Sequence, residues 1–490
     1  MSWGIKMAGV FMYYVSAFAA IGGLLFGYDV GVISGVLGDP NFKKVFAPLD
    51  SLRMGLITSF LVLGCFIGAL VSGWSTDKLG RRSSIMASSL VFTLGALFQT
   101  FSGGLGVMIV GRIIAGLAVG ILSMAVPLYQ CEVSEPSVRG RLMSLQQWAI
   151  TIGIAVSFWI NYLCSSFLKG EVAWRLPLGL QIVPAVILFF GCFVMPYSPR
   201  WLLSKGRESE AMEVLARLRA GGDKTHPAVL EEFNEIKDTL QQECSLSCSY
   251  ASLFEGTILR RVLLGVFIQA FQQLTGINSV MYYAPQIFKQ AGFGIQAGLL
   301  ATAINGIVNM TSTIPAILYV DQWGRRMTLM AGAVVMAIGM AVVGIIIVVY
   351  GVQSKDAITG ETIFSMRSIS ASYTVIVFIY IFVAGFAFSW GPIAWIYPAE
   401  IFPMRVRSKG ASLTTASNWA FNYIVSLLTP ILMDKITWGL YIVFAGFCVV
   451  MTLAVYFFYP ETCGYSLEDM DLVFAEEVSA CNPQIEKAKA

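Results

Sequence analysis

Long apolar stretches separated by short polar segments run through almost the whole chain. Twelve of them are long enough to cross a bilayer, because a helix needs about 20 apolar residues to span the hydrocarbon core. The pattern therefore predicts an all-α membrane protein with twelve transmembrane helices in two six-helix bundles. The expected spans are residues 10–32, 54–76, 84–104, 106–130, 140–163, 174–195, 261–288, 296–320, 327–350, 370–398, 409–433 and 438–459.

A polar segment between the sixth and seventh spans carries a helical pattern of its own. Apolar positions recur at helical spacing in residues 209–220 and 228–242. This pattern predicts two helices that join the bundles on the cytoplasmic side. The expected domains are an N-terminal six-helix bundle (1–203), a cytoplasmic helical linker (204–260), a C-terminal six-helix bundle (261–459) and a cytoplasmic tail (460–490).

Composition agrees with membrane insertion, since 57% of the 490 residues are hydrophobic and 12% are charged. With both termini inside, 22 of the 32 Lys and Arg residues fall in cytoplasmic segments, nine fall outside and Arg112 falls within a span. This asymmetry predicts that both termini are cytoplasmic. The plasma membrane is the default expectation for the location. The net charge of +3 indicates no nucleic-acid binding, because the basic residues form no patch.

Cysteine and histidine usage predicts no disulfide framework, no metal site and no enzyme. The nine cysteines are scattered, and Cys244 and Cys248 have a loosely metal-like spacing without a second pair. His226 is the single histidine, and the chain has no nucleotide-binding loop. The residues therefore do not supply a nucleophile, a base and an orienting group together.

Two ions stand alone inside apolar spans. Asp29 lies in the first span and Arg112 in the fourth, and an acid at mid-bilayer costs roughly 2.5 to 3.5 kcal/mol on insertion scales. The guanidinium favours the ionised carboxylate whereas burial favours the neutral acid, so a small change in helix separation decides which form is stable. We interpret the pair as a proton-coupling site. The alternative is a static ion pair that holds the N-terminal bundle together.

Glycines repeat at every fourth position of the first span, at Gly23, Gly27, Gly31 and Gly35. A stripe of small residues allows close helix packing in membranes. Asp29 is about 200° around the helix from Gly27 and is expected to face away from this contact.

Charged elements of the first half return in the second half. Asp77-Lys-Leu-Gly-Arg-Arg82 is repeated as Asp321-Gln-Trp-Gly-Arg-Arg326, and a Glu precedes an Arg by seven positions in both halves. Matched elements in the same order indicate a duplicated six-helix unit. We expect these residues to pair across the halves as an inner gate, although the Gly-Arg-Arg turns alone also fit ordinary positive-inside charge. The predicted gate consists of Asp77, Arg82, Glu132, Arg139, Asp321, Arg326, Glu400 and Arg407.

Several motifs resemble the signatures of the sugar porter family of the major facilitator superfamily, and the likeness extends from about residue 10 to 470. They are the two Gly-Arg-Arg turns, Pro196-Tyr-Ser-Pro-Arg200, Gln272-Gln-Leu-Thr-Gly-Ile-Asn278 and Pro460-Glu-Thr-Cys-Gly464. The resemblance implies a major facilitator fold that carries monosaccharides, with or without protons. The chain departs from the family at Tyr197, where Glu is usual, and at Cys463, where Lys is usual. The first departure removes an acid from the inner network.

A sugar offers hydroxyls that donate and accept and apolar ring faces, so its site needs neutral amides and aromatic rings. The resembling motifs imply such a site, although helix-to-helix hydrogen bonding, worth about 0.6 kcal/mol per bond, is the alternative for each amide. Gly276 and Gly391-Pro392 place helix breakers where we expect the seventh and tenth helices to bend. The expected substrate-binding residues are Gln147, Gln272, Gln273, Asn278, Tyr282, Asn309, Trp395, Asn418 and Trp419.

The resemblance also bears on coupling, because proton-coupled family members carry an acid where Asp29 falls and an arginine where Arg112 falls. The expected function is proton-coupled symport of a monosaccharide, with glucose and related hexoses favoured. The expected partners are the sugar, the proton and the lipid bilayer, with no cofactor, and the expected working unit is a monomer. The alternatives are a facilitative hexose uniporter and a membrane sugar sensor. A sensor would be expected to carry a longer tail than the roughly thirty residues after the last span.

Overall fold

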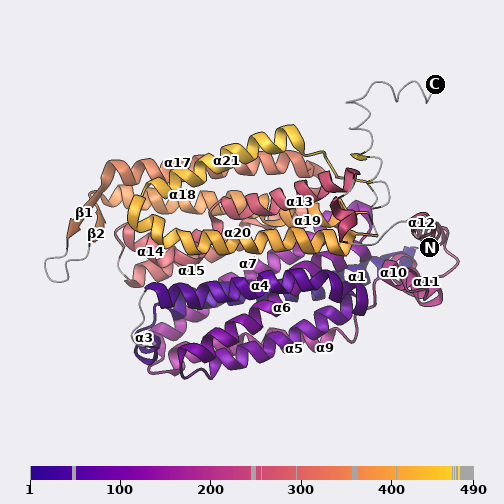
Figure 1. Ribbon diagram of the computed structural model, residues 1–490, viewed down its shortest axis with the longest axis horizontal. Helices are drawn as coiled ribbons and strands as arrows, with labels where there is room; N and C mark the ends of the chain where they lie inside the picture. Colours follow the sequence, from indigo (N-terminus) through magenta and orange to yellow (C-terminus); the bar gives the residue numbers. More distant parts are fainter. Residues whose placement is uncertain are drawn as a thin grey trace.

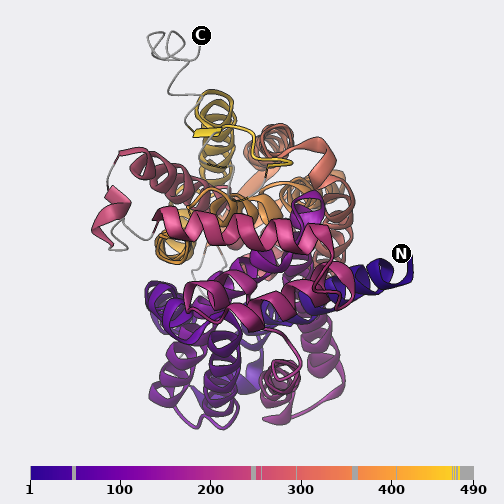
Figure 2. The same cartoon turned by 90° about the vertical axis from the view of Figure 1, so that its right-hand side faces the viewer.

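The computed structural model describes residues 2–46, 51–243, 250–254, 256–293, 295–355, 362–403, 405–465, 467, 470 and 473–474. Their long helices run roughly side by side in two layers, with the first half of the chain below and the second half above (Figure 1). We call the end that carries the linker helices the linker face, and the opposite end, beside α3 and the two strands, the far face. Figure 2 looks onto the linker face, which the linker helices cross.

The N-half comprises the helices before the linker. These are α1 (Ser2–Ala19), α2 (Ile21–Val36), α3 (Pro40–Val45), α4 (Ser51–Leu79), α5 (Arg81–Thr100), α6 (Leu105–Val133), η1 (Pro136–Val138), α7 (Arg139–Phe167), α8 (Val172–Leu180) and α9 (Ile182–Gly191). The linker contains α10 (Pro199–Ser204), α11 (Glu208–Ala220), α12 (Pro227–Glu243) and η2 (Ala251–Phe254). The two helices predicted for the linker are thus confirmed as α11 and α12.

The C-half repeats the arrangement. Its helices are α13 (Gly256–Leu274), α14 (Ile277–Gln290), α15 (Ile295–Ser312), α16 (Ile314–Trp323), α17 (Arg325–Tyr350), α18 (Ile369–Phe388), α19 (Trp390–Glu400), α20 (Arg407–Ile436) and α21 (Gly439–Phe458). The helical segments follow the twelve predicted spans in order, which confirms the fold class.

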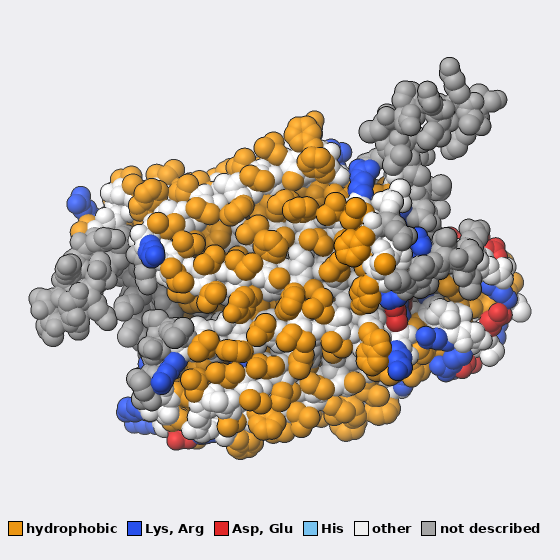
Figure 3. Space-filling view, viewed as in Figure 1, with side chains coloured by type: hydrophobic (Ala, Val, Ile, Leu, Met, Phe, Trp, Pro, Cys, Tyr) orange, Lys and Arg blue, Asp and Glu red, His pale blue; other side chains and the backbone are white. Residues whose placement is uncertain are grey.

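Ten of these spans, within the part of the chain that the structure describes, are long and apolar enough to cross a membrane. The other two predicted spans correspond to α13–α14 and to α20, which carry several amide and hydroxyl side chains that lower their apolarity. Apolar side chains cover the visible flank between the two ends, and charged side chains gather at the ends (Figure 3). This distribution is the one that a bilayer requires.

A small hairpin at the far face was not predicted. Strands β1 (Gly351–Lys355) and β2 (Thr362–Met366) pair antiparallel, with Gly351 opposite Met366. The prediction of an all-α chain omits them because two five-residue strands beside an apolar span show too little alternation to be recognised.

The glycine stripe packs α2 against α7, as predicted. A Cβ atom at Gly27 would lie 1.9 Å from the carbonyl oxygen of Ile150, and one at Gly31 would lie 2.0 Å from the hydroxyl of Ser157. No larger residue fits at this separation. The contact fixes α2 in register on α7 and directs Asp29 toward α6.

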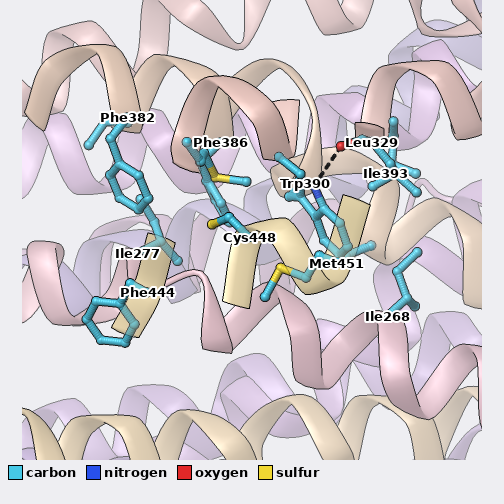
Figure 4. Packing of buried hydrophobic residues seen from close by; sticks show 14 of the residues in the cluster. Ile268, Ile277, Leu329, Phe382, Phe386, Trp390, Ile393, Phe444, Cys448 and Met451 are labelled. Carbon is cyan, nitrogen blue, oxygen red and sulfur yellow. Dashed lines mark hydrogen bonds between the residues drawn. The ribbon is translucent and has the colours of Figure 1, made fainter. Parts of the chain in front are cut away.

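Two spans of the C-half are broken. Gly276, with φ +88°, separates α13 from α14, as predicted. The tenth span breaks at Ser389, two residues before the predicted Gly391-Pro392. The shift follows from the proline, whose ring excludes the carbonyl four residues earlier, at Phe388, from the helix. Beyond this break the indole of Trp390 donates to the Leu329 carbonyl at 2.9 Å inside an apolar core (Figure 4).

Candidate functional site

A cavity lined by thirteen residues lies between the halves. Helices α2 and α7 form its N-half wall, and α13, α14, α15, α18 and α19 form its C-half wall. Six of the nine predicted substrate-binding residues line it: Gln147, Gln272, Gln273, Asn278, Asn309 and Trp395. Residues predicted on separate spans thus meet around one volume.

Three amides of the C-half wall, Gln272, Gln273 and Asn278, are held in one network with Asn418. The Gln272 amide donates to the Trp390 carbonyl at 2.9 Å, and its oxygen accepts from Asn418 at 2.6 Å. The Gln273 amide donates to Asn418 at 2.9 Å, and its oxygen accepts from Asn278 at 2.6 Å. Because both ends of each glutamine are bonded, the network fixes their orientation.

Three predicted binding residues lie behind the cavity wall. Asn418 is fully buried and orients the two glutamines. The indole of Trp419 donates to the Ser123 hydroxyl at 3.0 Å and therefore joins the halves. Tyr282 is buried and does not line the cavity, whereas its neighbour Met281 does. The predicted direct contact differs from this arrangement because helix rotation, which the sequence leaves undefined, turns these side chains away from the cavity.

Sequence reasoning missed the apolar part of the lining. These residues are Phe26, Val30, Ile150, Ile154, Ile277, Met281 and Phe386. In a span, an apolar residue that faces a cavity resembles one that faces lipid. Phe26 and Val30 could have been predicted to line the cavity, because they lie close to Asp29 on the same helix.

The two buried ions meet directly. A guanidinium nitrogen of Arg112 lies 2.6 Å from Asp29 Oδ1, and both side chains are fully buried. Arg112 Nε also donates to the Ile57 carbonyl at 3.1 Å. Asp29 Oδ2 and Arg112 Nη2 have no hydrogen-bond partner among the described residues. Each ion therefore keeps one polar atom without a hydrogen-bond partner among the described residues. Val30, the residue after Asp29, lines the cavity.

Ion pairs hold each half together at the linker face. Arg81 pairs with Glu132 at 2.8 Å in the N-half, and Arg325 pairs with Glu400 at 2.8 Å in the C-half. All four side chains are buried, where charge-assisted hydrogen bonds are strong. Arg325 also pairs with Asp321 at 3.1 Å.

Further bonds cross between the halves at this face. Asp321 accepts from the backbone N–H groups of Gly140 and Arg141 at 3.1 and 2.8 Å. Arg139 donates to the Tyr465 carbonyl at 3.2 Å, and Arg81 donates to the Ser408 hydroxyl at 3.0 Å. The structure therefore has its linker face closed.

The closure differs in detail from the predicted gate. Arg82 and Arg326, the second arginines of each turn, donate to the carbonyls of Phe193 and Tyr456 instead of pairing with the acids. The reason is rotational, because consecutive helical residues point about 100° apart and the first arginine faces inward. Asp77 lies 3.8 Å from Arg81, and Arg407 donates to the Phe402 carbonyl at 3.1 Å. Glu132 and Glu400 pair within their own halves, not across them.

Tyr197 occupies the position where the family usually has an acid. The guanidinium of Arg82 lies 4.8 Å from the centroid of the Tyr197 ring, and that of Arg207 lies 5.5 Å away. The ring also stacks on Trp201 at 5.3 Å. Cation–π contacts thus take the place of an ion pair and attach the linker to the N-half.

The described residues contain no group of three or more His, Cys, Asp or Glu side chains that could hold a metal ion. Cys244 and Cys248, the pair with loosely metal-like spacing, lie outside the described residues.

Comparison with known proteins places the chain among transporters. Residues 15–474 match the family described as "Sugar (and other) transporter". The chain is 40% identical to the MFS glucose transporter mfs1 of Aspergillus flavus, over 94% of this chain and 89% of that protein. It is 36% identical to the high-affinity glucose transporter of Kluyveromyces lactis, over 97% and 87%. It is also 37% identical to the high glucose sensor RGT2 of Saccharomyces cerevisiae, covering 95% of this chain but 61% of that protein.

Solved structures agree. The proton:xylose symporter XylE bound to 6-bromo-6-deoxy-D-glucose superimposes with a TM-score of 0.83 at 28% identity, over 94% of this chain and 99% of that one. The inward-open conformation of XylE from E. coli, with the same identity and coverage, has a TM-score of 0.69. The chain belongs to the sugar transporter family of the major facilitator superfamily.

Proposed function

We propose that this sugar transporter is a symporter that carries a hexose, with glucose as the first candidate, together with a proton by alternating access. The observation that supports it most is the buried Asp29–Arg112 pair, 2.6 Å apart and adjacent in sequence to Val30 in the cavity wall. A charge pair in that place is expensive unless it has a role.

The sugar is proposed to bind in the cavity between the halves. Gln147 supplies an amide from the N-half, Gln272, Gln273, Asn278 and Asn309 supply amides from the C-half, and Trp395 supplies a ring. Amides present donors and acceptors together, which suits hydroxyls, and the indole suits an apolar ring face. The names of the relatives, two of which are glucose transporters, support a hexose.

The proton is proposed to act on Asp29. Protonation removes the charge that holds Arg112, which weakens the tie between α2 and α6 and allows the halves to rock around the bound sugar. When the linker face opens, the sugar leaves, Arg112 recaptures the carboxylate and the proton departs. One charge crossing 100 mV releases about 2.3 kcal/mol, and one pH unit adds about 1.4 kcal/mol. With one proton per sugar, this sustains a gradient of roughly several hundredfold.

The linker-face bonds are proposed to be the inner gate. The Asp321 contacts to Gly140 and Arg141 and the Arg81–Ser408 bond cross between the halves and must break before the sugar leaves on that side. The Arg81–Glu132 and Arg325–Glu400 pairs, each within one half, hold the arginines in position for these contacts. We further infer that the linker and both termini are cytoplasmic, that the surface membrane is the site of action, and that the monomer is sufficient.

The test is uptake of labelled glucose into proteoliposomes with and without an imposed pH gradient. Wild-type protein should concentrate glucose only with the gradient, and a protonophore should abolish accumulation. Asp29→Asn should still exchange glucose but should lose both accumulation and the accompanying proton uptake. Asp223→Asn, which changes an exposed acid of the linker, is the matched control and should behave as wild type. Accumulation by Asp29→Asn equal to that of wild type would show that the carboxylate is not the coupling site, and equilibration without accumulation by wild type would indicate a uniporter.

A further inference from the structure

A second asparagine on α15, Asn305, lies one helical turn before Asn309. Residues four apart lie on the same helix face, and Asn309 lines the cavity. Asn305 is fully buried, yet its Oδ1 has no hydrogen-bond partner among the described residues, and the same is true of Asn309 Oδ1. Two unused amide acceptors therefore lie in register along one face of α15.

An unused buried acceptor is costly, by about 1–3 kcal/mol. Buried polar atoms generally have partners, so each exception needs a physical reason. Asn305 Nδ2 contacts the thioether sulfur of Met281 at 3.8 Å, and sulfur of this kind is a weak acceptor. The site therefore holds a strongly polar group against a poor partner.

Met281 contacts Asn305 and also faces the cavity. Met281 lines the cavity, and methionine is unbranched and adapts its shape easily. It belongs to α14, which Gly276 separates from α13 and in which Tyr283 departs from helical geometry. Asn305 belongs to α15, which packs closely on α7 at Gly306. Asn305 therefore lies on the closely packed helix α15, whereas Met281, which contacts it, lies on α14, whose helical geometry is interrupted.

We propose that Asn305 is a specificity-determining residue of the sugar site, exposed to the substrate when Met281 moves aside. Its Oδ1 accepts a hydrogen bond from a hydroxyl at the end of the sugar nearest the far face, while Asn309 binds the sugar one turn deeper. Four residues of helix span about 6 Å, a distance comparable to that between hydroxyls on opposite sides of a hexose ring. The inference rests on the proposed hexose substrate.

The experiment compares equilibrium binding of glucose and of each single-deoxy glucose by wild-type protein and by Asn305→Leu. The leucine is similar in size and removes the acceptor. Glucose affinity should fall about tenfold, which corresponds to 1.4 kcal/mol, while affinity for one deoxy sugar, which lacks the hydroxyl read by Asn305, should stay unchanged. Thr302→Val is the control, because the Thr302 hydroxyl on the same helix is already bonded to the Gly298 carbonyl at 2.8 Å, and it should show no selective loss.

Thermal unfolding of the same proteins separates recognition from a structural role. If Asn305 serves only the fold, leucine should lower the unfolding midpoint, whereas the proposal expects the midpoint to stay or rise, because an unpartnered buried amide is removed. An equal loss of affinity for all the sugars, or unchanged glucose affinity, would overturn the proposal. Binding is measured without a pH gradient, so failure of proton coupling would leave this result intact. Absence of any hexose binding by wild type would overturn both.

Discussion

The two halves share a skeleton but differ in what they bury. In both, a glycine with positive φ, Gly80 or Gly324, precedes a buried arginine that pairs with an acid at 2.8 Å. Away from the linker face, the two halves bury different polar groups. The N-half buries an ion pair between α2 and α6, whereas the C-half buries a network of neutral amides between α13 and α20.

This difference separates two kinds of chemistry within one fold. A carboxylate changes charge when it takes a proton, and an amide does not, so of these two buried sites only the Asp29–Arg112 pair responds to protonation. Amides supply donors and acceptors for hydroxyls without a net charge to desolvate. The linker face, where both halves must close, keeps the matched ion pairs.

The largest effect is expected from breaking the N-half pair. Arg112→Met leaves Asp29 buried without its partner and should lower the free energy of unfolding by about 3–5 kcal/mol. Adding Asp29→Asn removes the uncompensated charge and should restore most of the loss. Chemical denaturation in detergent measures both variants. A double variant no more stable than the single one would mean that the two ions do not act as a pair.

A smaller loss is expected from the packing of α2 on α7. Gly27→Ala places a methyl group 1.9 Å from the Ile150 carbonyl oxygen, and such overpacking costs about 1–3 kcal/mol. Gly55→Ala on α4 is the control, because nothing lies within 4 Å of the added carbon. The unfolding midpoint should fall for the first variant and stay or rise for the second. Equal midpoints would mean that the stripe is not a close contact.

The smallest effect concerns the adjacent arginines at the linker face. Arg81→Gln replaces a charged donor, which bonds Glu132 within the N-half and Ser408 across the halves, with a neutral amide. The exchange of a charge-assisted bond for a neutral one costs about 1 kcal/mol, so the linker face should open more often. The buried thiol of Cys131, which lies beside the Ala399 carbonyl at 3.5 Å between the halves, should then be alkylated faster, as followed by mass spectrometry. Arg82→Gln, at the partly exposed neighbour, should leave that rate within about twofold. The same rate in both variants would contradict the assignment of Arg81.

Features that repeat along many residues could be predicted from the sequence. The twelve spans, the two linker helices and the glycine stripe each depend on a period that tertiary contacts reinforce, and all were found where expected. Of the proposed site, the amides that line the cavity were predicted from the family motifs that the sequence resembles, together with the chemistry that a sugar requires.

Features that depend on rotation about a helix axis could not be predicted. Arg81 and Arg82 are equivalent in sequence, and only the start of α5 decides which faces Glu132. Asn418 has the residue type of a sugar ligand but lies behind Gln272 and Gln273. The role proposed for Asn305 could not be predicted, because it rests on an unpaired acceptor, which is a property of packing.

The absence of room between α2 and α7 has a mechanical consequence. Asp29 shares α2 with the cavity residues Phe26 and Val30, while Gln147 and Ile150 line the cavity from α7. Because the glycines bring the two helices into close contact, α2 has no room to slide over α7. A displacement of Asp29 should therefore move the N-half wall of the proposed sugar site by the same amount. A methyl group in the stripe would loosen that transmission while leaving every polar group on both helices in place.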